Sequence, residues 1–96
     1  MNGSVGLARA LGHVRNAMVA FVAAEDPSGE SLFLAAECLD LEGLFAELGV
    51  EPELLDPEPD ARASLDAASH ALAGARPLVP LALWAGLQAV RARAPR

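Results

Sequence analysis

The chain contains no isoleucine, threonine, tyrosine or lysine, so valine is its only β-branched residue. β-Branched and aromatic side chains are the ones that favour strands, and aromatic residues make up only 4% of this chain. Alanine and leucine, which dominate the composition, are among the best helix formers. The composition therefore predicts an all-α protein.

Positive charge is also scarce. Lysine and arginine together number 7 against 13 acidic residues, which gives a formal net charge of −6. No basic residue lies between Arg15 and Arg62, where most of the acids are found. Because nucleic acids and anionic membranes repel an acidic protein, we expect no nucleic-acid partner and no membrane partner. We also expect the acidic middle of the chain to lack internal counter-charges.

Cys38 is the only cysteine, which excludes a disulfide within the chain. The N-terminus lacks the charged and apolar pattern of a signal peptide, and the apolar runs are too short to span a bilayer. We therefore expect a cytoplasmic protein. Ninety-six residues are the size of one domain, so we expect a single helical domain over residues 1–96.

Apolar residues recur along the chain at alternating spacings of three and four, which is typical of helices packed along a seam. Four such helices are expected, the first beginning after a cap at Ser4 and ending near Glu25. Their buried stripes are predicted to be Leu7, Leu11, Val14, Met18 and Phe21; Leu34, Cys38, Leu41, Phe45 and Leu48; Ala61, Leu65, Ala68, Leu72 and Ala75; and Leu83, Leu87, Val90 and Ala94.

Proline and glycine mark the ends of these segments. Gly49 is suited to follow the second helix, and Arg76-Pro77 is expected to stop the third. Asp56-Pro57 and Pro80 are expected to start the third and fourth helices. Between the second and third helices, Val50–Pro59 contains three prolines. It is predicted to be a connector whose leucines pack back onto the bundle.

These segments predict an antiparallel bundle of four helices, with short links that favour the order up-down-up-down. One alternative is an α+β fold. In that case Asp26-Pro27-Ser28-Gly29 would be the turn of a β-hairpin rather than the start of the second helix.

No arrangement of residues indicates catalysis. The possible metal ligands are few and spread over several segments, without the paired Glu-x-x-His of di-metal bundles or clustered zinc ligands. They are His13, His70, Cys38, Glu37, Asp40 and Glu47. Cys38 lies on an apolar stripe, which predicts a buried and inert thiol. We therefore predict a non-enzymatic protein with no metal and no cofactor.

The segment Ser31–Gly49 carries a second apolar face beside its core stripe, and Asp40–Gly43 is a candidate break within it. The fourth helix has surplus apolar residues as well. We predict an interaction surface made of Leu32, Ala35, Leu39, Leu81 and Trp84. It predicts a protein–protein interaction module, such as a small adaptor, regulator or assembly factor, with a homodimer as the expected assembly.

A second hypothesis is a small-molecule-binding or catalytic helical domain with a pocket between helices. Its walls would be Trp84, Phe21 or Phe45, and an arginine would hold an anion. A pocket of a few hundred cubic ångströms converging on an arginine or histidine would favour this hypothesis over a solid core.

Overall fold

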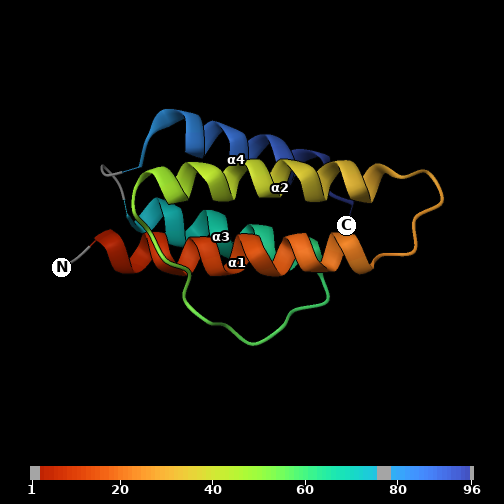
Figure 1. Cartoon of the computed structure of the whole chain (residues 1–96), viewed down its shortest axis with the longest axis horizontal. Coiled ribbons are helices and arrows are strands. Elements are labelled where there is room, and N and C mark those ends of the chain that lie inside the picture. Colours follow the sequence, from red (N-terminus) through yellow and green to blue (C-terminus); the bar gives the residue numbers. More distant parts are fainter. Residues whose placement is uncertain (1–2, 76–78, 96) are drawn as a thin grey trace.

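A computed structural model describes residues 3–75 and 79–95, and within these ranges the chain forms helices and no strand (Figure 1). The helices are α1 (Gly3–Ala23), α2 (Glu30–Glu47), α3 (Ala61–Gly74) and α4 (Leu81–Arg93). The all-α class and the antiparallel helical bundle of four segments are confirmed. The expected stop of the third helix at Arg76-Pro77 lies outside the described residues.

The hairpin alternative is wrong, because residues 26–29 form a turn between two helices. The Asp26 carboxylate closes this turn by accepting the backbone N–H of Ser28 at 3.0 Å and that of Ser31 at 2.9 Å. The hydrogen bond from the Ser28 hydroxyl is the largest cause that lowers the pKa of Asp26 from 3.8 to about 2. Gly29 then enters α2 with a φ of 78°, a left-handed conformation that suits glycine.

The connector between α2 and α3 lies along α1 and has no regular structure from residue 50 to residue 60. Glu53 donates its backbone N–H to the Ala8 carbonyl at 3.0 Å. About two turns further along α1, the Asn16 amide donates to the Asp56 carbonyl at 2.9 Å. The connector therefore runs in the same direction as α1 and returns the chain to the end of the bundle where α2 began.

This return makes the expected order up-down-up-down wrong. Since α3 starts beside the C-terminal end of α1, it runs parallel to α2 and antiparallel to α1 (Figure 1). The order is up-down-down-up. An extended chain covers roughly 3.3 Å per residue, so a connector of this length has the reach to run back along the bundle where a short link would not.

The start of the third helix also differs from the prediction. It begins at Ala61 rather than after Asp56-Pro57, because Asp60 is its N-cap and accepts the backbone N–H groups of Arg62 and Ala63. An aspartate at this position satisfies donors that the first helical turn leaves unpaired. Pro57 and Pro59 remain in the connector.

The core lies where α1 packs on α2 and α3, and α4 closes the bundle against α2 and α3. The predicted stripes supply this core, with three exceptions: Met18 and Ala61 are half-buried and Leu48 is exposed. The candidate break at Asp40–Gly43 is absent, since α2 is continuous from Glu30 to Glu47. A glycine inside a helix costs only about 1 kcal/mol, which the buried face of α2 outweighs.

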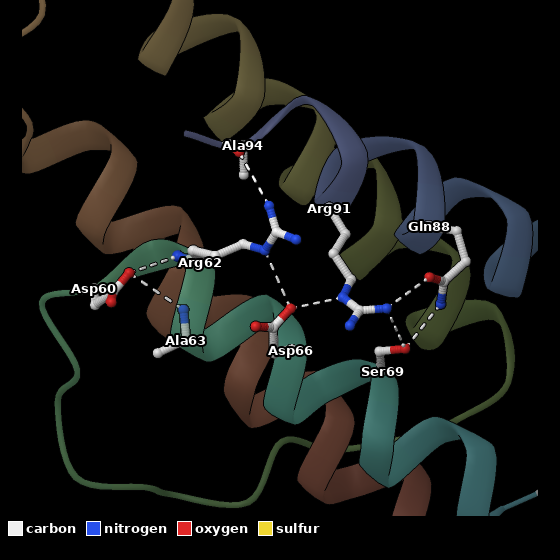
Figure 2. A network of polar contacts seen from close by, with 8 residues as sticks. All are labelled: Asp60, Arg62, Ala63, Asp66, Ser69, Gln88, Arg91 and Ala94. Carbon is white, nitrogen blue, oxygen red and sulfur yellow. Dashed lines mark hydrogen bonds and ion pairs between the residues drawn. The ribbon is translucent and has the colours of Figure 1, made fainter. Parts of the chain in front are cut away.

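A polar network joins α3 to α4 (Figure 2). Arg91 donates from Nε to Asp66 at 2.7 Å and from Nη1 to Gln88 at 3.1 Å, and a longer bond of 3.4 Å reaches Ser69. Arg62 pairs with Asp66 as well, at 3.2 Å and one helical turn away on α3. These two arginines, with the Arg91 hydrogen bond as the largest cause, lower the pKa of Asp66. Arg91 lies in the last turn of α4, and its hydrogen bonds therefore connect the end of this helix to α3.

Candidate interaction surface

The outer side of α2 carries an exposed apolar stripe that faces away from the core. Its members follow one another at spacings of four, three, four and three, the pattern of a helix–helix seam. We call this set the α2 stripe: Leu32, Ala36, Leu39, Gly43 and Ala46. Leu32 is 61% exposed and Leu39 is 59% exposed, and a Cβ added at Gly43 would meet no atom within 4 Å.

Helix α1 extends this apolar surface. The ion pair between Arg15 and Glu42, at 2.8 Å, fixes how α1 and α2 align side by side (Figure 1). Because the two helices are antiparallel, residues that follow Arg15 in α1 lie level with residues that precede Glu42 in α2. Val19 and Val22 therefore lie level with the part of the α2 stripe that precedes Glu42. Both valines are exposed. We call the combined surface the α1/α2 face.

Ion pairs border the α2 stripe on both sides. Arg93, from the end of α4, pairs with Glu30 at 3.0 Å and with Glu37, and Arg15 pairs with Glu42. The expectation that the acidic middle lacks internal counter-charges is therefore wrong. The fold brings the basic ends of the chain back beside α2, and each arginine in the described ranges takes part in an ion pair.

The structure divides the five residues of the predicted surface. Leu32 and Leu39 are exposed on the α2 stripe, but Ala35 is only 6% exposed and belongs to the core. Leu81 is exposed and Trp84 is half-buried. Both lie two turns before α4 residues that bond to α3, so they are on the side of α4 away from α2. The five residues do not form one surface, and including Ala35 was wrong.

Several residues of the α1/α2 face were missed from the sequence. Phe33, which is 67% exposed, borders the α2 stripe, and Ala36 and Gly43 lie within it. The alternating spacing that predicted the core stripes also contains these two residues. This spacing would have placed Ala36, rather than Ala35, on the same face of the helix as Leu32 and Leu39. Val19 and Val22 have no comparable signal, because the preceding position at the same spacing is the charged Arg15.

Cys38 sits in the core with no exposed surface. Burial is the largest cause that raises the pKa of its thiol to about 12, and the negative charges of Glu42 and Glu37 add to the effect. A thiolate is the reactive form of cysteine, so this side chain is inert at neutral pH. In the described ranges, no three histidine, cysteine, aspartate or glutamate residues are grouped to hold a metal ion.

A groove of about 280 Å³ lies between the connector, α1 and α3. Ser64 is one of the residues around it, and its hydroxyl oxygen is buried and has no hydrogen-bond partner among the described residues. His13 also lines it, and burial is the main cause that lowers the pKa of this histidine. Phe21 and Phe45, two of the expected pocket walls, lie instead in the core.

Comparisons with protein-family models, curated proteins and solved structures find no match for this chain. In the ranges that the structure describes, none of the helices combines the length and the apolar character needed to cross a membrane.

Proposed function

We propose that this chain is a non-enzymatic protein–protein interaction module, a small adaptor, regulator or assembly factor, that self-associates through the α1/α2 face. The observation that carries the proposal is the α2 stripe. It is an exposed apolar seam at helical spacing on a helix whose opposite side already fills the core. The proposal includes a cytoplasmic location, for which the lone buried cysteine is the support.

The energetics favour a partner for this face. Burying a leucine contributes roughly 1.5–3 kcal/mol, and contiguous exposed apolar patches on small proteins commonly mark interaction sites. The α2 stripe carries no charge of its own, so covering it leaves no ion unpaired. A two-fold dimer is the commonest assembly of soluble chains, which makes a second copy the first partner to test.

Replacing Leu39 with glutamate is expected to weaken the self-association by roughly 100-fold or more. Leu39 lies at the centre of the α2 stripe, and the change would place a carboxylate inside each half of the interface. Because Leu39 is 59% exposed in the single chain, the variant should keep its helical content. Sedimentation velocity over a dilution series measures the association, and circular dichroism measures the helical content.

Leu54→Glu is the matched control, since Leu54 is 94% exposed on the connector, outside the α1/α2 face. It makes the same chemical change and should leave the association constant unchanged. Leu81→Glu tests the exposed leucine of α4 in the same way and is also expected to leave the dimer intact. A wild-type chain that stays monomeric at millimolar concentration would refute self-association.

We propose one second candidate function, the binding of a small neutral polar molecule in the groove lined by His13 and Ser64. The unpartnered Ser64 hydroxyl supports it, because buried polar groups are normally hydrogen-bonded. The acidic residues Asp56 and Glu58, which also line the groove, disfavour an anion. The arginine clamp expected from the sequence finds no support here, as no arginine lines this groove.

NMR titration with small alcohols and amides tests this second candidate. If the groove binds such molecules, the ring signals of His13 should shift in a saturable way. Replacing Ser64 with alanine should weaken the shift. His70 is exposed on α3 and serves as the internal control, whose signals should stay in place. If none of the compounds moves the His13 signals at millimolar concentration, the groove is not a binding site for this class.

A further inference from the structure

We infer that the α2 stripe pairs with the α2 stripe of a second copy in antiparallel orientation, with Leu32 opposite Gly43 and Leu39 opposite Ala36. This geometry rests on the proposed self-association and names the arrangement that the stripe favours. It follows from the sizes of the residues in the stripe and from the charges on its two borders.

From Leu32 to Gly43, the stripe alternates between large and small residues. The two leucines, Leu32 and Leu39, occupy one of the two seam positions of successive heptads, and Ala36 and Gly43 occupy the other. In an antiparallel pair of helices, a residue at one seam position packs against a residue at the other seam position of the partner helix. Every leucine therefore faces a small residue of the second copy, each layer has a similar thickness, and the helices approach closely.

A parallel pair would lack this complementarity. It would place Leu32 against Leu32 and Gly43 against Gly43 of the second copy, so that a thick layer would alternate with a void. Voids forfeit packing energy, and oversized layers force strained side chains. The size pattern of the stripe is thus self-complementary only when the two copies run in opposite directions.

The borders of the stripe favour the same orientation. On the side facing α4, antiparallel pairing brings Phe33 beside Asp40 of the second copy. On the side facing α1, it brings Ala35 beside Glu42, whose charge Arg15 already balances. A parallel pair would instead bring Glu42 beside Glu47, and adjacent like charges oppose association.

The antiparallel arrangement also makes use of α1. A two-fold axis brings equivalent edges of the two copies together, so both α1 helices flank the paired stripes on one side. Val19 and Val22, which are level with the stripe and exposed, then extend the apolar contact beyond α2. The interface becomes a four-helix layer of α1 and α2 from each copy.

Disulfide trapping with two single variants, Leu32→Cys and Gly43→Cys, tests this geometry. Both positions are exposed and tolerate a small side chain. Under mild oxidation, an equimolar mixture should give covalent dimers up to about half of the dimer population, the share that contains one chain of each kind. Each variant oxidised alone should give none. The two positions are about 16 Å apart along a helix, well beyond the roughly 7 Å that a disulfide bridges.

The wild-type chain is the control for Cys38, which is buried and should not form covalent dimers. Covalent dimers from each variant alone, with none added by mixing, would show a parallel pair and overturn the inference. Dimers that sediment normally but give no disulfide in any combination would place the interface away from the α2 stripe. Both results leave self-association standing, whereas a monomer in sedimentation would refute the proposed function itself.

Discussion

Replacing Phe45 with alanine is expected to lower the free energy of unfolding by about 3–5 kcal/mol. Phe45 has no exposed surface and is the largest fully buried side chain of the core. Its removal loses the transfer energy of the ring and leaves a cavity that helices on either side cannot fill. Since small domains are stable by only about 5–15 kcal/mol, this loss is a large fraction of the total. Urea unfolding followed by circular dichroism measures it.

Phe33→Ala is the matched control on the same helix, because Phe33 is 67% exposed and packs no core. In dilute solution it should change the free energy of unfolding by less than about 0.5 kcal/mol. Equal losses from the two variants would contradict the orientation of α2, since both faces of the helix would then be buried to the same extent. A loss at Phe33 that appears only in concentrated solution would instead support the dimer.

The core could be predicted from the sequence because periodicity alone determines which face of a helix is apolar. Leu34, Cys38, Leu41 and Phe45 share one side of any helix that includes them, whatever the helix packs against. The same holds for Leu83, Leu87 and Val90, all of which are buried. The buried face of each helix could therefore be predicted without knowledge of the tertiary structure.

The order of helix directions could not be predicted in the same way. It depends on whether the connector turns sharply or runs back along α1, and the connector has no periodicity to indicate this. What decides it is a hydrogen bond from Glu53 to Ala8 and the close approach that Gly12 permits. These contacts join residues that are far apart in the sequence. No local sequence pattern around Ala8, Gly12 or Glu53 predicts that they meet.

The exposure of the five surface residues was predicted in part, and the errors have a common cause. Leu32 and Leu39 are exposed as expected, but the neighbours assigned to them depended on the exact rotation of α2. A shift of one residue, from Ala36 to Ala35, moves a side chain by about 100° around the helix. Leu81 and Trp84 were grouped with α2 because they are apolar, whereas their place on α4 directs them to α3.

Replacing Gly12 with alanine is expected to lower the free energy of unfolding by about 1–3 kcal/mol, the usual cost of overpacking. The new Cβ would lie 2.5 Å from the Glu53 carbonyl oxygen and 2.9 Å from Leu55 Cδ1. The carbonyl belongs to the backbone of the connector, so it can move away only by disturbing the bond from Glu53 to Ala8. Thermal and urea unfolding measure the loss, and hydrogen exchange at Glu53 reports on the bond.

Gly43→Ala makes the same substitution in the interior of α2, where a Cβ meets open space. It should raise the stability of the single chain by roughly 0.5–1 kcal/mol, because alanine loses less backbone freedom than glycine on entering a helix. The two variants are therefore expected to differ in sign. If both raised the stability, the connector would not lie against Gly12. In that event the parallel placement of α2 and α3, which depends on the connector's path along α1, would lose its main support.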